Sequence, residues 1–201
     1  MKSGGMSHKH IKLGASKIMS YNIDSMVNDV LSFGAKNAAI IDPGNIKGVP
    51  ALREMCALNS CGKYGTNWMC PPATGPIDEL TKKIKLYKHG LVFQTVYQLE
   101  DSFDFEGMMD AKAIHQKVFD KVLTAFKDKY RLNDFLPLGA GACEICAECT
   151  YKNGEKCRFP DKAIASMEAY GIDVTALVTS CGIPYNNGES TVSYVGLVLF
   201  N

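Results

Sequence analysis

The sequence has no block of like charge and no long apolar run. Its 22 Lys and Arg residues balance 21 Asp and Glu residues, and this balance points to neither duplex nucleic acid nor an anionic membrane as a partner. No window approaches the roughly 18 consecutive apolar residues of a membrane helix. The first 30 residues also lack an apolar stretch followed by a small-residue cleavage site. We therefore expect a cytoplasmic protein.

Familiar catalytic motifs are also missing. The chain has no His-Glu-x-x-His zinc helix, no phosphate-binding glycine loop and no nucleophile elbow. Gly139-x-Gly141 alone does not specify a nucleotide site. His115 falls on the apolar seam of a predicted helix, where a hydrogen-bonded packing role is the ordinary one. These absences leave any reaction unspecified.

Cysteine, in contrast, is abundant. There are eight cysteines, and in a reducing compartment so many thiols are more naturally metal ligands than disulfides. Four of them form the run Cys143-x2-Cys146-x2-Cys149-x7-Cys157. The first three cannot all leave one face of a helix or strand, so the chain must wrap one compact object there, and an iron–sulfur cubane fits this spacing. A zinc ion, which usually takes its ligands from two separated pairs, is the alternative, followed by free thiols or two disulfides.

The fourth ligand of this run follows from a predicted turn. Asn153-Gly154 is a strong signal for a two-residue type I′ hairpin, since both residues tolerate positive φ. Such a hairpin pairs Thr150 with Cys157 and returns Cys157 to a position beside Cys149. We therefore expect Cys157 to complete the ligand set.

A second group consists of Cys56, Cys61 and Cys70, expected in a binding loop after loop residues 44–50. Three thiols at these gaps can merely pack, but the other cysteine run strengthens the case for a second metal or cluster site. Trp68 is placed to shield such a site from water. One coordination position stays open unless Cys181 fills it, yet Cys181 falls on the core face of a helix that begins after Asp173 and is expected to pack.

Periodicity and turn signals predict one α/β or α+β domain over residues 19–201, with 1–18 as a tag remnant and flexible N-terminus. About four strands are expected, covered by helices. The predicted helices lie at about 22–34, 76–87, 104–130, 160–171 and from 173; the predicted strands lie at 38–43, 91–99 and 192–200, with an extended segment at 135–142. The last strand is apolar on both faces in its second half and should be central.

These motifs resemble a prokaryotic family of uncharacterised predicted metal-binding proteins, a domain of unknown function common in anaerobes. The resemblance covers about residues 19–200. It rests on Cys61-Gly62-Lys63-Tyr64-Gly65, Cys70-Pro71-Pro72, the run from Cys143 to Pro160, and Ser166 to Asp173. It implies metal or cluster binding by the seven cysteines of the two groups, and it implies no reaction. The Cys143 run is also similar to bacterial ferredoxin loops, but it has seven residues before its last cysteine.

The leading hypothesis is a redox or electron-transfer protein with a 4Fe-4S cluster on the Cys143 run and a second metal or cluster on the Cys56 group. Lys152, Lys156 and Arg158 would offset thiolate charge and could face an acidic redox protein. The alternatives are an enzyme with an open three-thiolate site and a structural zinc-binding scaffold. The oligomeric state is not specified.

Overall fold

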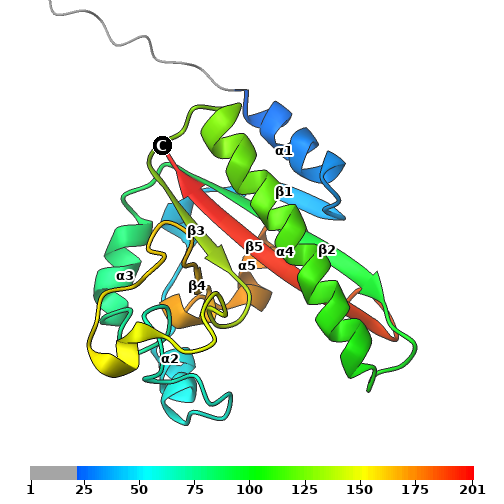
Figure 1. The fold of residues 1–201 in the computed structure, drawn as a ribbon. Coiled ribbons are helices and arrows are strands. Elements are labelled where there is room, and N and C mark those ends of the chain that lie inside the picture. The colour runs from blue at the N-terminus through cyan, green and yellow to red at the C-terminus, as the bar shows by residue number, and fades with distance from the viewer. Residues whose placement is uncertain (1–21) are drawn as a thin grey trace, which may run out of the picture.

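The computed structural model describes residues 22–201, so the expected N-terminal segment 1–18 lies outside it. Its centre is a five-stranded mixed sheet in the order β1-β2-β5-β3-β4 (Figure 1). The strands are β1 Asn37–Ile41, β2 His89–Gln98, β3 Phe135–Gly139, β4 Ala165–Ser166 and β5 Thr191–Phe200. The predicted class of a mixed α/β fold is confirmed, with one strand more than expected.

Five helices are present in residues 22–201. They are α1 Ile23–Ser32, α2 Pro50–Ala57, α3 Ile77–Ile84, α4 Phe105–Asp128 and α5 Val174–Ser180, together with the 3₁₀ turns η1 Pro43–Asn45, η2 Thr150–Asn153 and η3 Glu168–Tyr170. Two helix starts that were predicted from N-cap residues are confirmed. Asn22 caps α1 by accepting from the backbone N–H of Asp24, and the Asp173 side chain accepts from Ala176 N at the start of α5.

β2 and β5 form the longest ladder, antiparallel from His89 opposite Phe200 to Gln98 opposite Thr191. β5 is the third strand of five, and its second half is buried on both faces, as predicted. His89 opens β2, with its ring 5.4 Å from that of Phe200.

Helices cover both faces of this sheet. On one face, α1 and α4 pack Met26, Val30, Val118, Phe119 and Phe126 against the strands (Figure 1). On the other face, α3, α5 and the segment around η3 contribute the buried side chains Leu80, Ile84, Met167, Ile172, Leu177 and Val178. No helix in residues 22–201 is long and apolar enough to cross a membrane.

The helix predicted for residues 160–171 is wrong. Ala165–Ser166 instead forms strand β4, which runs parallel to β3 with Ala165 opposite Leu138. The Met167 N–H continues this contact by donating to the Gly139 carbonyl at 3.1 Å. The apolar residues of this segment are spaced as in a helix. An isolated helix of this length has only marginal stability, and pairing with β3 buries the same side chains. Gly171, the predicted stop, does end η3 with a φ of +71°.

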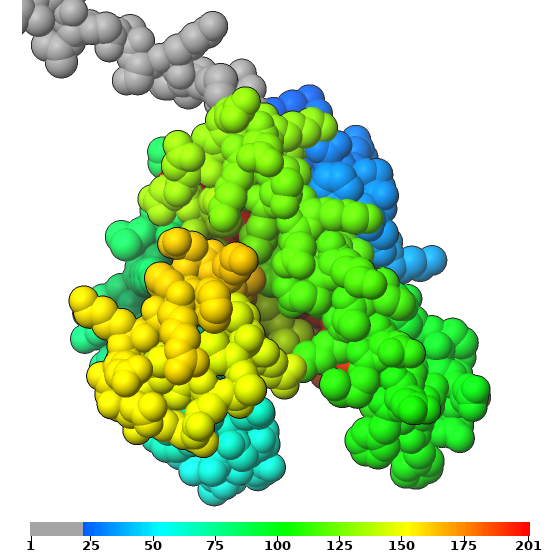
Figure 2. Space-filling view, viewed as in Figure 1, coloured from blue at the N-terminus to red at the C-terminus, as the bar shows by residue number. Residues whose placement is uncertain are grey.

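The two cysteine stretches lie together, away from the outer end of α4. Figure 2 shows residues near 150 (yellow) against those near 60 (cyan), forming a lobe separated by a hollow from the N-terminal end of α4 (green). The Cys143 run follows β3, and α2, which bears Cys56, contacts η3 just after the edge strand β4. The fold thus places both cysteine groups near the β3–β4 edge of the sheet.

Candidate metal centre

The four cysteines of the run line one small cavity. Cys143 follows the end of β3, Cys149 precedes η2 and Cys157 follows it, and all four side chains are partly buried. The cavity measures about 20 Å³, and its remaining walls are Asn67, Trp68, Met69, Ile145, Phe159 and Ala163. Four soft thiol donors inside a mostly apolar wall are the donor set of iron–sulfur clusters and of zinc.

Electrostatics gives the same grouping. Burial raises the pKa of Cys143, and a hydrogen bond from the Ile145 N–H lowers it. The negative charges of Cys157, Cys149 and Cys146 also raise it. The four thiols are therefore within electrostatic reach of one another. Within residues 22–201, no three His, Cys, Asp or Glu side chains are placed to hold a single metal ion. The thiols surround a cavity and do not meet at one point.

The predicted type I′ hairpin is wrong, although the chain does turn back. Residues Thr150–Asn153 form η2, and only Gly154, at φ +71°, adopts the left-handed conformation. The Thr150 hydroxyl donates to the Lys156 carbonyl at 2.9 Å, and the Glu155 N–H donates to the Thr150 carbonyl at 3.1 Å. The buried Thr150 thus holds the returning segment one residue before Cys157. Its hydroxyl takes the place of the expected ladder.

Charged side chains hold the outside of this loop. Arg158 donates to the Glu148 carbonyl at 3.2 Å, and Lys112 of α4 forms an ion pair with Glu144 at 2.7 Å. Lys152 lies 3.5 Å from the Glu148 carboxylate, with both side chains mostly exposed. Exposed pairs contribute little stability. They connect the loop between Cys143 and Cys149 to α4 and to the residues that follow η2.

The second group lies partly on a helix. Cys56 belongs to the last turn of α2, so the prediction of a loop there is wrong. Pro50 opens that helix, in the first-turn position that proline favours. Cys61 is exposed in the following turn, and Cys70 directly precedes Pro71.

The three thiols of the second group lie within electrostatic reach of one another, although in residues 22–201 they too are not placed to hold a single metal ion. Burial raises the pKa of Cys70, a hydrogen bond from Asn67 lowers it, and the negative charges of Cys61, Cys56 and Cys143 raise it again. The last of these charges belongs to the other group. The two cysteine groups are therefore adjacent, which the spacing of neither group indicates.

Arg53 positions this second group, and the sequence pattern did not single it out. Its guanidinium donates to the Thr74 hydroxyl at 3.0 Å, to the Gly75 carbonyl at 2.8 Å and to the Ala169 carbonyl. These bonds connect α2 to the segment after Cys70 and to η3. Burial raises the pKa of Cys56, while the Arg53 charge opposes that rise and the charges of Cys61 and Glu168 add to it.

Trp68 joins the two groups. Its indole N–H donates to the Glu155 carbonyl at 3.0 Å, and its ring meets that of Tyr151 edge to face at 4.9 Å between centroids. We expected Trp68 to shield the Cys56 group. In the structure its side chain lines the cavity of the Cys143 group instead.

Cys181 lies at the end of α5, outside both cysteine stretches of the chain. It caps the C-terminal end of α5 and packs, partly buried, against the core. Burial raises the pKa of its thiol, and a hydrogen bond with Ser180 lowers it. This placement agrees with the packing role expected for Cys181.

Fold and site together define an α/β protein with two adjacent cysteine groups. The model of the family described as "Predicted metal-binding protein (DUF2284)" matches residues 39–200, and the chain belongs to that family. The match confirms the family resemblance and supports metal binding. No curated protein and no solved structure matches the chain.

Proposed function

We propose that the protein carries a 4Fe-4S cluster on Cys143, Cys146, Cys149 and Cys157 and acts in electron transfer. The observation that carries this proposal is that all four thiols line one cavity; at about 20 Å³ it has room for about one water, so the loop would move outward to hold a cluster. A cluster held there supplies one-electron redox chemistry. The chain supplies the ligands and fixes them through Thr150, whose hydroxyl holds the returning segment.

The apolar wall is the second contribution of the chain. Trp68, Met69 and Phe159 lie around the thiols, and an apolar shell limits water access and influences the reduction potential of a metal site. Phe159 is still 40% exposed. The site is thus shielded on the side of Trp68 and closer to solvent on the side of Phe159.

The Cys56, Cys61 and Cys70 group supports a second metal or cluster in the same proposal. The charge of Cys143 reaches Cys70, so the two centres would be neighbours. Lys152 and Lys156 are exposed beside the Cys143 run, and we propose an acidic redox protein as the partner of this surface because opposite charges steer association.

Metal analysis after anaerobic purification tests the proposal. We expect a brown protein with iron and acid-labile sulfide, about four of each per chain for one cluster. Cys157→Ala should lose most of the iron held by the run, and Cys181→Ala serves as the matched control. A colourless protein that holds zinc without sulfide would show a structural zinc scaffold instead. Iron unchanged in Cys157→Ala would remove the four-ligand assignment.

One observation favours an enzyme as the second candidate. Cys61 is exposed, and three thiolates leave a position on a bound metal where water or substrate binds. Imidazole added to the iron-loaded protein should then change its electron paramagnetic resonance spectrum, and should no longer do so in Cys61→Ala. An unchanged spectrum of the parent protein would exclude an open position.

A further inference from the structure

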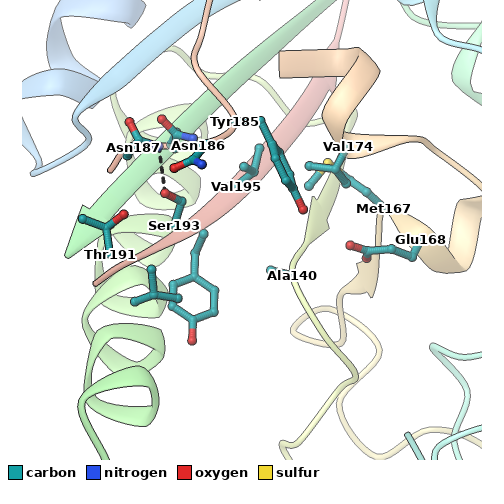
Figure 3. A pocket seen from close by; sticks show the side chains of 13 residues that line it. Ala140, Met167, Glu168, Val174, Tyr185, Asn186, Asn187, Thr191, Ser193 and Val195 are labelled. Carbon is teal, nitrogen blue, oxygen red and sulfur yellow. Dashed lines mark hydrogen bonds between the residues drawn. The ribbon is translucent and has the colours of Figure 1, made fainter. Parts of the chain in front are cut away.

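A larger cavity, of about 390 Å³, lies beside the cysteine lobe. Residues from both faces of β5 line it: Ser193 and Val195 do so, and so does Tyr194, whose hydroxyl donates to the Met108 carbonyl of α4. β3 pairs with β5 only from Leu197 to Phe200, so the cavity lies along the part of β5 beyond that pairing. Figure 3 shows its other walls, formed by Tyr185 and by Met167 with its neighbours.

Hydrogen bonds already fix one wall of this cavity. The Asn187 amide donates to the Pro184 carbonyl at 3.2 Å and to the Ser193 hydroxyl at 2.9 Å. The fully buried Gln94 amide also donates to the Pro184 carbonyl, at 2.9 Å, and accepts from Asn37 at 2.8 Å. The loop that bears Tyr185 is thus held against the sheet, and the cavity is a formed feature of the fold.

Two polar groups in the cavity do not take part in the hydrogen bonds that hold its wall. Within residues 22–201, the Glu168 carboxylate and the Tyr185 hydroxyl have no hydrogen-bond or ion-pair partner. Figure 3 shows both extending into the same part of the cavity, above Ala140. None of the lining residues is Lys, Arg or His, and Glu168 is the one carboxylate among them.

We propose that this cavity binds a small organic cation, an amine attached to a compact apolar body. Its volume falls within the range of roughly 300–1,000 Å³ typical of ligand pockets. The Glu168 carboxylate would pair with the positive charge, and the Tyr185 ring would add a cation–π contact. Met167, Val174 and Val195 offer the apolar surface for the rest of the molecule.

The position of the cavity links this ligand to the cysteine lobe. Ala140 lies three residues before Cys143 in the chain, and the charge of Glu168 reaches Cys56. A cation bound at Glu168 would therefore lie near Cys56 and near the segment that leads into the Cys143 run, which suits a substrate or effector of a redox centre. This link rests on the proposed function, whereas the binding itself does not.

Three probes of equal size and different charge test the binding: benzylamine, benzyl alcohol and benzoate. Each is titrated into the anaerobically purified protein and followed by ligand-observed NMR. We expect benzylamine to bind about threefold to fivefold more tightly than benzyl alcohol, because a charge contact with an exposed carboxylate contributes at most about 1 kcal/mol, and benzoate to bind least.

Glu168→Gln should abolish this preference for benzylamine. Glu168 is exposed, so the isosteric change should leave the fold intact. Glu100→Gln, an exposed glutamate outside the cavity, is the matched control and should change nothing. Tyr185→Leu should weaken benzylamine by several-fold and benzyl alcohol less, because it removes the aromatic face.

Iron and sulfide are measured in the same samples, which separates the two proposals. Benzylamine binding that depends on Glu168 in a protein without a cluster would support the cation site and contradict the proposed redox function. Absence of benzylamine binding, equal binding of all three probes, or equal effects of Glu168→Gln and Glu100→Gln would overturn the cation site whatever the iron content.

Discussion

Gly154→Ala should destabilise the Cys143 run, whereas Asn153→Ala should not. Gly154 ends η2 at φ +71°, and an added Cβ would meet nothing within 4 Å. The cost is therefore in the backbone alone, about 1–2 kcal/mol for an L-residue in the left-handed conformation. Alanine also restricts the unfolded chain, which offsets about 0.4–1 kcal/mol of this cost. We expect a net loss near 1 kcal/mol. Asn153 lies inside η2 and carries no such strain.

Thermal unfolding of the anaerobic, iron-loaded protein measures this difference. For a chain of this size, 1 kcal/mol lowers the Tm by about 2–4 °C. Gly154→Ala should show that decrease and should also release iron faster to a chelator, since the turn returns Cys157 to the cavity. Asn153→Ala should unfold within about 1 °C of the parent protein, as an ordinary surface substitution does.

The comparison of the two variants decides between two turns. A type I′ hairpin needs positive φ at both central residues, so it predicts similar losses for Asn153→Ala and Gly154→Ala. Equal decreases in Tm would therefore refute the η2 turn. No decrease in either variant would refute the argument from strain at Gly154.

Three further outcomes are expected. Burial lowers the pKa of His115 from 6.5 to about 4. As the pH falls, the histidine of the unfolded chain is therefore protonated before that of the folded chain. The free energy of unfolding should be unaffected by this group above pH 6.5 and should decrease by about 3 kcal/mol between pH 6.5 and pH 4. Urea unfolding across this window should show that slope in the parent protein and a flatter one in His115→Gln. Cys181→Ala should keep the full metal content and lose about 1 kcal/mol, and a metal loss as large as that of Cys61→Ala would contradict this. Trp68→Phe keeps an aromatic ring but loses the N–H donor to Glu155, so oxygen should bleach the cluster faster than in the parent protein; an unchanged rate would argue against shielding by Trp68.

Much of the fold follows from local signals in the sequence. Asn22 has the side chain that caps a helix, and it does cap α1. The second half of β5 is apolar at every position but Gly196, as a strand buried on both faces requires. In each case the residues that specify the structure are neighbours in the chain.

Two of the errors arise where another contact outweighs a local pattern, in one case with a distant strand and in the other within the same loop. Residues 160–171 carry a helical pattern, yet β3 binds Ala165 and Ser166 as a strand. Asn153-Gly154 carries a hairpin pattern, yet the Thr150 hydroxyl reaches the Lys156 carbonyl and sets a 3₁₀ turn. A tertiary contact that buries apolar surface or satisfies a carbonyl outweighs a local preference of a few tenths of a kcal/mol.

The adjacency of the two cysteine groups comes from a contact between distant segments. Their spacing identifies each group separately, but the contact between them depends on Trp68, which reaches Glu155 across 87 positions of the chain. Neither stretch has a core of its own, so each is ordered in part by the other. A metal held by the Cys143 run would fix the wall that Trp68 belongs to, and with it the segment from Trp68 to Cys70. Binding at the first group should therefore favour binding at the second, since the second would then lose less conformational freedom on closing around its own metal.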